Sequence, residues 1–193
     1  IDDIRNSFKL FTERLPEDGT LIINTDIDDY KYFFSESSCE VITVGSSSET
    51  SMYSPADITF DDSGCCSYKL VVNNEASFNS SFTDSESNGA VVNLSVPGIH
   101  NVYNSLAAIA VARKLGISTD TIIAGLNKFT GTDRRFQKKG SFNGITVVDD
   151  YAHHPDEISA TLESTRHFEH NRVWCVFQPH TYTRTKAFLG DFA

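Results

Sequence analysis

The fold is decided by residues 145–178, which read ITVVDDYAHHPDEISATLESTRHFEHNRVWCVFQ. The β-branched run at 145–149 predicts a strand, and Pro155 followed by two acidic residues predicts the start of a helix. The run RVWCVFQ at 172–178 predicts a second, buried strand. This order predicts a right-handed strand–helix–strand crossover, whose two loops open at the sheet edge where α/β folds bind ligands.

The amino-terminal half predicts helices and strands in alternation. Residues 1–15 place apolar side chains at helical spacing, and residues 27–36 predict a second helix rich in aromatic residues. Two short runs, TLIIN at 20–24 and CEVITVG at 39–45, predict buried strands. The alternation suggests a parallel sheet layered with helices.

Residues 46–95 are rich in Ser, Asn and Gly. Segments such as ITFDD, SYKLVVN and AVVNLSV alternate apolar with polar residues, which predicts small antiparallel strands. A flexible surface insertion is the alternative for this composition, and the alternation favours the sheet.

Two helices and a hairpin are predicted further along. A strong helix is expected over 101–115, with a glycine just past its end, and a shorter helix over 119–128. The Asn-Gly pair at 143–144 is a strong hairpin signal, so residues 135–142 should pair with 145–149.

Residues 130–133, TGTD, are the best candidate linker. We therefore expect two domains, 1–132 and 133–193. The patterns together predict an α/β chain in which a small antiparallel sheet accompanies parallel strands and helices.

Composition limits the classes of partner. The 193 residues carry 16 Lys and Arg against 26 Asp and Glu, a net charge of −10, so we expect no nucleic-acid partner. The longest apolar run, 106–112, is far short of the roughly 20 residues that span a bilayer, so no membrane insertion is expected. Four cysteines without zinc-like spacing indicate reduced thiols in the cytoplasm. A start at Ile1 without a leader-like segment favours a cut within a longer chain.

Polar side chains concentrate in the two loops of the expected crossover. The first loop, Asp149 to His154, holds two carboxylates and two imidazoles, and the second, Gln178 to Arg184, adds His180. Small turn residues would suffice at a sheet edge, so the concentration indicates a site more than a solvated polar rim.

Two further groups indicate an anionic, purine-containing ligand. A basic cluster suited to a phosphate group consists of Lys128, Arg134, Arg135, Lys138 and Lys139. Asn101 and Asn104 share a face at a helix start, where amides can read a purine edge, and His100 precedes them where anions are favoured. A solvated basic face and a simple helix cap are the alternatives.

Four motifs occur in order: GIHNVYNSLAAIA, TDRRF, VVDDYAHHPDEISATL and VFQPHTYTRTKAF. Together they resemble the Mur ligase family over about residues 97–193, and the LPEDGTLIINTDIDD stretch agrees more weakly. The resemblance implies part of a central ATPase-type domain followed by part of a Rossmann-like, amino-acid-binding domain. Among such ligases the motifs are most similar to those of the member that joins L-alanine to UDP-N-acetylmuramate, a cytoplasmic enzyme of peptidoglycan synthesis.

The resemblance implies a role for each motif residue. His100, Asn101 and Asn104 match residues on the adenine side of ATP. Arg135 matches an arginine that contacts the nucleotide, and Asp150 a carboxylate near the ribose. Residues matching those around the muramoyl carboxylate and the incoming alanine are Tyr151, His153, His154, His180 and Arg184. Many relatives have Arg where this chain has Thr181, so either Arg184 suffices with a hydroxyl and His180, or the clamp for the alanine carboxylate is arranged differently.

The implied reaction is ATP-dependent amide formation through an acyl phosphate. Arginine and Mg²⁺ stabilise phosphoryl transfer, and either His153 or His154 would accept the proton of the alanine amine. No phosphate-binding loop of the G-x-x-x-x-G-K-[ST] type occurs, so we expect that loop and the Mg²⁺ ligands upstream, and an inactive isolated chain.

Three alternatives remain open at this point. A related ligase that recycles murein tripeptide shares a similar D-x-A-H-H-P motif. An Asp and His metal hydrolase would use Asp149, Asp150, His153, His154 and His180 as ligands. A nucleotide- or peptide-binding module without catalysis is the third.

Overall fold

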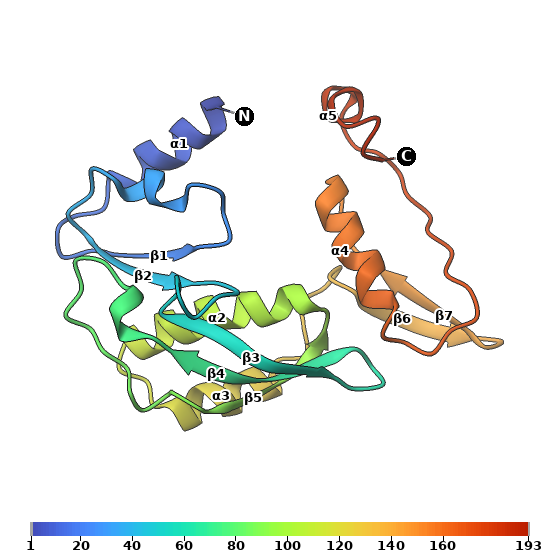
Figure 1. Cartoon of the computed structure of the whole chain (residues 1–193). Coiled ribbons are helices and arrows are strands. Elements are labelled where there is room, and N and C mark those ends of the chain that lie inside the picture. Colours follow the sequence, from blue (N-terminus) through green and yellow to red (C-terminus); the bar gives the residue numbers. More distant parts are fainter. Residues whose placement is uncertain (1, 193) are drawn as a thin grey trace.

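The protein forms two lobes joined by residues 129–136. A computed structural model describes residues 2–192. The first lobe, residues 2–128, holds a five-stranded sheet with its helices, and the second lobe, residues 137–192, holds a two-stranded hairpin and two helices (Figure 1). The expected α/β fold class with a small antiparallel sheet is confirmed.

Five strands in the order β1-β2-β3-β4-β5 form the sheet of the first lobe. They are Thr20–Asn24 (β1), Glu40–Val44 (β2), Tyr53–Phe60 (β3), Cys65–Val72 (β4) and Val91–Pro97 (β5). β1, β2 and β3 are parallel neighbours, whereas β3, β4 and β5 pair antiparallel. The Ser-rich segment 46–95 therefore completes the main sheet, and the antiparallel strands expected there are confirmed.

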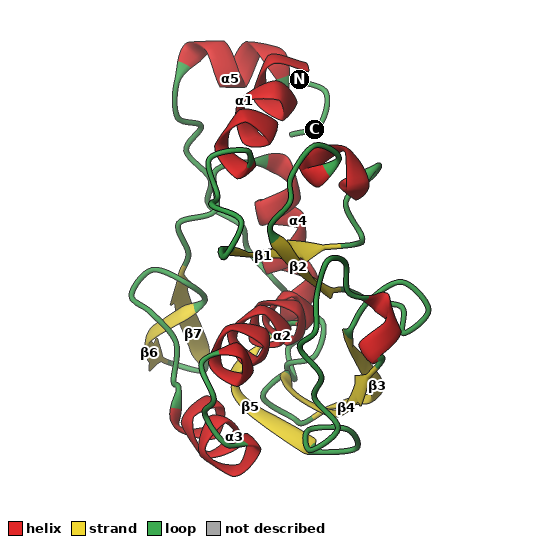
Figure 2. Cartoon of the chain, turned by 90° about the vertical axis from the view of Figure 1, so that its left-hand side faces the viewer, coloured by secondary structure: helices red, strands yellow, loops and turns green. Residues whose placement is uncertain are grey.

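Helix α2, Ile99–Lys114, covers one face of this sheet and contacts all five strands (Figure 2). Its Val102, Leu106 and Ile109 are buried in a core with side chains from β2 to β5. Gly116, with a φ of 79°, lies just past its end and supplies the left-handed residue that ends the helix, as expected. Helix α3, Thr119–Lys128, follows and contacts β5.

The other face of β1 and β2 packs against a single 3-10 turn, η1, Tyr30–Phe34. The helix expected over 27–36 is shortened to this turn. Asp29 adopts a left-handed φ of 54°, which a right-handed helix cannot include, so the turn begins only at Tyr30. Helix α1, Asp2–Thr12, contacts η1, and the apolar side chains it leaves exposed are Ile4, Phe8, Leu10 and Phe11.

A buried ion pair fastens the β4–β5 connection, which includes the 3-10 turn η2, Asn74–Ala76. The fully buried Asp84 carboxylate accepts from Arg113 Nε at 3.1 Å and from Nη2 at 3.0 Å, and from Tyr53 Oη at 2.8 Å. Burial alone would raise the pKa of Asp84, but hydrogen bonds from Arg113, Ser87 and Tyr53 outweigh it and lower the pKa. These bonds order a segment with little apolar content.

The second lobe begins with the predicted hairpin. Strands β6, Gln137–Phe142, and β7, Ile145–Asp149, pair antiparallel, and the Asn-Gly turn between them has φ values of 47° and 78°, as a two-residue I′ turn requires. Helix α4, Pro155–Thr165, starts where the sequence predicts it, and a short helix α5, Tyr182–Ala187, lies near the carboxyl end.

Residues 172–178 form no strand, so the expected crossover is wrong. β7 pairs only with β6, and Val176 within the run is 98% exposed. An apolar β-branched run gains ladder hydrogen bonds only when an extended neighbour lies beside it, and this run has none among residues 2–192. The loops 149–154 and 178–184 therefore do not leave adjacent strands of one sheet.

The two lobes meet along α4 and the residues after it. Gly98, with a φ of 94°, lies so close to α4 that a Cβ on it would be 2.4 Å from Ser164 Oγ. At the tip of the β3–β4 hairpin, the ring of Phe60 stacks on that of His167 with centroids 3.8 Å apart. These contacts position α4 against the first lobe.

Two expectations from composition can be compared with the structure. Cys39, Cys65, Cys66 and Cys175 are free thiols, as predicted. Among residues 2–192, no helix has both the length and the apolar character needed to cross a membrane.

The buried ion pair predicts a large loss of stability when Arg113 is replaced. We expect Arg113→Met to lower the free energy of unfolding by about 3–5 kcal/mol, because it leaves the Asp84 charge buried and uncompensated. Arg166→Met is the matched control, since its ion pair with Glu163 is exposed and contributes little. Urea unfolding of the two variants measures this, and equal losses would contradict the assigned importance of the buried pair.

The same pair predicts an acid dependence. Because the pKa of Asp84 is lower in the folded than in the unfolded chain, its stabilisation is complete above the unfolded value and is lost as pH falls through the folded value. Unfolding measured at decreasing pH should therefore show a loss that Asp84→Asn no longer shows.

Candidate functional site

The carboxylate of Asp150 links the TDRRF turn, residues 132–136, to the loop after β7, which contains the YAHH segment, residues 151–154. Asp150 Oδ2 accepts from the backbone N–H of Phe136 at 2.7 Å, and Oδ1 accepts from that of Ala152, also at 2.7 Å. Hydrogen bonds from backbone N–H groups to a charged carboxylate are stronger than those between neutral groups. Asp150 therefore sets the position of the turn relative to the YAHH segment.

The turn that carries Arg135 has an uncommon backbone. Its neighbours Arg134 and Phe136 have φ values of 61° and 46°, in the left-handed region that bulky residues seldom adopt. Tyr151 stabilises this turn through two contacts with Arg134. The Tyr151 N–H donates to the Arg134 carbonyl at 2.8 Å, and the Tyr151 ring centroid lies 4.4 Å from the guanidinium carbon of Arg134. Such conformations persist only where the surroundings fix them, which is common at functional sites.

His100 brings the start of α2 to this turn. Burial is the largest influence on its imidazole and lowers the pKa, while the Asp150 carboxylate raises it and the Arg135 guanidinium lowers it. Both charged groups therefore lie within electrostatic reach of His100. His100 Nδ1 is buried and has no hydrogen-bond partner among the described protein atoms. A buried polar nitrogen in this state needs an explanation, and a ligand atom is one.

The two asparagines share a face, as expected, but they also serve the helix start. Asn101 Nδ2 donates to the carbonyl of Pro97 at 2.8 Å, and Asn104 Nδ2 donates to Asn101 Oδ1 at 3.2 Å. Asn104 is exposed. The cap and the purine contact proposed for these residues are thus both compatible with the geometry.

Glu157 organises the start of α4. Its Oε2 accepts from the backbone N–H of His153 at 3.0 Å and of His154 at 3.3 Å, and the bond from His153 is the largest cause of its lowered pKa. The Arg135 guanidinium also lowers the pKa of Glu157. In the sequence, Glu157 is marked only as an acidic residue in the first turn of a helix. Its spacing of three residues from His154, a capping-box spacing, was the available hint.

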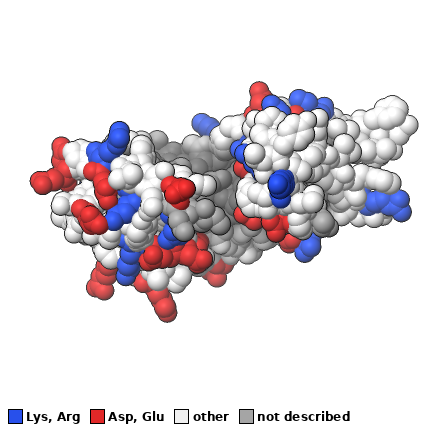
Figure 3. Space-filling model, turned by 90° about the horizontal axis from the view of Figure 1, so that it is seen from above, with Lys and Arg blue, Asp and Glu red and all other residues white. Residues whose placement is uncertain are grey.

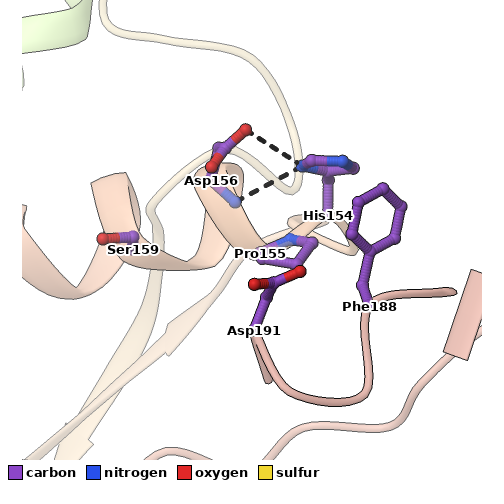
Figure 4. Close-up of a pocket in the computed structure, with 6 residues that line it drawn as sticks. All are labelled: His154, Pro155, Asp156, Ser159, Phe188 and Asp191. Carbon is purple, nitrogen blue, oxygen red and sulfur yellow. Dashed lines mark hydrogen bonds and ion pairs between the residues drawn. The ribbon is translucent and has the colours of Figure 1, made fainter. Parts of the chain in front are cut away.

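His154 and the end of α5 line an open hollow of about 390 Å³ (Figure 4). The ring of Phe188 meets that of His154 edge to face, with centroids 4.7 Å apart. The hollow is lined by His154, Pro155, Asp156, Ser159, Phe188 and Asp191. The YAHH segment and the carboxyl-terminal segment therefore do meet, through Phe188, a residue that the motif reading did not single out.

His180 and Arg184 belong to this carboxyl-terminal segment. His180 is exposed, and Arg184 is half-buried in α5. Thr181 caps α5 by accepting from Arg184 N at 3.3 Å, with a φ of 68° that is rare for a β-branched residue. Within the described residues, no hydrogen bond or ion pair joins the side chain of His180 or Arg184 to Asp150 or His153.

Figure 3 shows how the charged side chains are distributed on one face of the molecule. On this face, seen from above, Lys and Arg side chains are interspersed with Asp and Glu side chains over both lobes.

Within residues 2–192, no three His, Cys, Asp or Glu side chains are grouped so that they could hold a metal ion. The geometry thus does not favour the metal-hydrolase alternative.

Comparison with known proteins identifies the family. Residues 1–112 match the model described as the Mur ligase middle domain, and residues 134–193 match the model described as the Mur ligase, glutamate ligase domain. The chain belongs to the Mur ligase family. The resemblance carried by the four motifs is therefore confirmed.

Several curated UDP-N-acetylmuramate–L-alanine ligases match the whole chain. The UDP-N-acetylmuramate–L-alanine ligase of Lachnospira eligens is 60% identical over 193 residues, which is 100% of this chain and 39% of that protein. The ligase of the same name from Agathobacter rectalis is 46% identical, with the same coverage. The chain thus spans about 39% of the length of the curated Mur ligases it matches.

Solved Mur ligases have the same fold. The UDP-N-acetylmuramate–alanine ligase of Thermotoga maritima matches with a TM-score of 0.63 and 25% identity, over 93% of this chain and 45% of that one. A murein peptide ligase of Psychrobacter arcticus matches with a TM-score of 0.64 and 28% identity, over 93% and 35%.

The Asp150 contacts predict a local effect of substitution. An amide side chain has one acceptor oxygen, so Asp150→Asn leaves one of the two N–H groups facing a donor. We expect hydrogen exchange at Phe136 or Ala152 to accelerate by about tenfold or more, equivalent to ~1.4 kcal/mol. Asp149→Asn is the neighbouring control. Unchanged protection at both amides in Asp150→Asn would contradict the assigned contacts.

Proposed function

We propose that the chain is part of an ATP-dependent ligase that joins L-alanine to UDP-N-acetylmuramate. The observation that carries the proposal is 60% identity over the whole chain to a ligase of that name. Both substrates are small molecules, and the amide product belongs to peptidoglycan synthesis. The Mur ligase family consists of ATP-dependent, amide-forming enzymes, which supports the reaction class.

The nucleotide side of the site would be formed where α2 faces the TDRRF turn. The unpartnered Nδ1 of His100, the cation of Arg135 and the exposed amide of Asn104 suit an anionic nucleotide. Asn101 and Asp150 would complete this side. ATP would supply the phosphoryl group that activates the muramoyl carboxylate. Mg²⁺ is expected with it, and we assign it no ligand, because the described residues form no such cluster.

The amino-acid side would be formed by the YAHH loop and α5. Tyr151 is fixed by the TDRRF turn, and the imidazoles at 153–154 would include the proton acceptor for the alanine amine. Arg184 would receive the alanine carboxylate, with His180 beside it. Since no hydrogen bond or ion pair joins Arg184 to His153 among the described residues, the proposal requires α5 to approach the loop when substrate binds.

We also propose a domain boundary between residues 132 and 133. Residues 1–132 would be the later part of the ATP-binding domain, and residues 133–193 the start of the Rossmann-like domain. The two family models, which end at 112 and begin at 134, support a boundary near this point. A cytoplasmic location is expected for such an enzyme, because its nucleotide substrates are cytoplasmic.

Replacing the aligned 193 residues of the Lachnospira eligens ligase by this chain gives a direct test. We expect the chimera to release phosphate from ATP only when both UDP-N-acetylmuramate and L-alanine are present, and to form the amide product. The unmodified enzyme is the positive control. Absence of ligation by a folded chimera would contradict the proposal, and preference for murein tripeptide over L-alanine would favour the recycling ligase.

Arg184 gives a second test in the same chimera. Arg184→Ala should raise the KM for L-alanine roughly 10- to 100-fold, the value of a lost charged hydrogen bond of ~1.5–3 kcal/mol, and leave the KM for ATP nearly unchanged. Lys186→Ala, an exposed cation on the same helix, is the matched control. An unchanged KM for alanine would remove Arg184 from the carboxylate site.

A further inference from the structure

The neutral imidazole rings of His153 and His154 differ in which ring nitrogen carries the lone pair. His153 Nδ1 lies 2.9 Å from the carbonyl oxygen of Tyr151. A carbonyl oxygen only accepts hydrogen bonds, so Nδ1 must carry the proton. The lone pair of the neutral ring is then on Nε2, where it can accept a proton.

His154 has the opposite arrangement. Its Nδ1 lies 3.4 Å from the backbone N–H of Asp156, which it caps at the start of α4, and also 3.4 Å from the exposed Asp156 carboxylate (Figure 4). Because Nδ1 accepts the backbone N–H of the cap, the proton of the neutral ring is on Nε2. The lone pair of His154 is used by the helix start, where the next N–H groups would otherwise lack a partner.

Glu157 distinguishes the two rings further. Its Oε2 lies 3.5 Å from His153 Nδ1 and accepts the backbone N–H of both histidines. A carboxylate beside the protonated nitrogen holds the ring in this orientation. The same Oε2 closes the capping box with His154, so one carboxylate orients one imidazole and places the other as a cap.

We propose that His153 Nε2 is the proton acceptor for the incoming amine, that Glu157 positions it, and that His154 is a structural cap. This inference rests on the proposed ligase function and separates two histidines that the motif alone leaves equivalent. The alanine nitrogen forms the C–N bond with its lone pair and gives a proton to Nε2. Phosphate leaves the activated carboxyl carbon with the electron pair of the C–O bond, and the imidazolium returns its proton to water.

The test uses the full-length chimera described above, and activity of the parent chimera reports separately on the proposed function. His153→Asn keeps an N–H donor near Nδ1 but has no basic nitrogen. We expect kcat to fall about 100-fold or more, the contribution of a general base, with a much smaller change in the KM for alanine. His153→Ala should lose a similar factor and regain activity as imidazole is added. Glu157→Gln should lower kcat less than His153→Asn does, and Glu157→Asp should restore part of it.

Two other histidines provide the comparisons. His170 Nδ1 also lies close to the carbonyl two residues earlier, that of Phe168, at 2.6 Å, but His170 is exposed after α4, so His170→Asn is the matched control. His154→Ser keeps a capping oxygen, and His154→Ala loses it, so Ala should lower the melting temperature more than Ser does. The proposal is overturned if His154→Ser loses as much kcat as His153→Asn, or if His153→Ala stays inactive in imidazole while remaining folded.

Discussion

The site depends on the carboxylate of Asp150, which holds two backbone segments in fixed register. One segment contains a left-handed Phe136 and the other contains Ala152, and each donates one N–H at 2.7 Å. Without such a charged acceptor, a turn with two bulky left-handed residues would relax to ordinary backbone angles. Arg135 lies inside this turn, between Arg134 and Phe136, and Glu157 accepts the backbone N–H groups of His153 and His154 just after the loop.

The second constraint is the close packing of α4 on the first lobe. Gly98 leaves no room for a side chain opposite Ser164, and the next residues of the chain begin α2 with His100. The same contact therefore brings the start of α2 near the carboxyl end of α4. Arg135, in the turn between the lobes, lowers the pKa of His100 in the first lobe and that of Glu157 in the second.

Local signals account for the parts of the fold that the sequence analysis predicted. The Asn-Gly turn, Gly116 past the end of α2 and Pro155 at the start of α4 each act through their own backbone, so neighbouring residues suffice to recognise them. The strand expected at 172–178 failed because pairing depends on a partner elsewhere in the chain. The Asp84–Arg113 pair was not predicted, because it joins residues 29 positions apart and no short pattern marks it. Similarly, motif matching named the histidines of the site but not their tautomers, which Tyr151 and Asp156 decide.

The structural and nucleotide-binding roles assigned to Asp150 are compatible. An ionised carboxylate offers about four lone-pair directions, and the two backbone N–H groups use one on each oxygen. The remaining directions can accept a ribose hydroxyl without releasing the TDRRF turn. A nucleotide bound in this way would contact the same carboxylate that orders Arg135, so binding would stabilise the strained turn as well as fill the site. A neutral amide has too few acceptors for both roles, and this accounts for an acidic residue at this position on physical grounds.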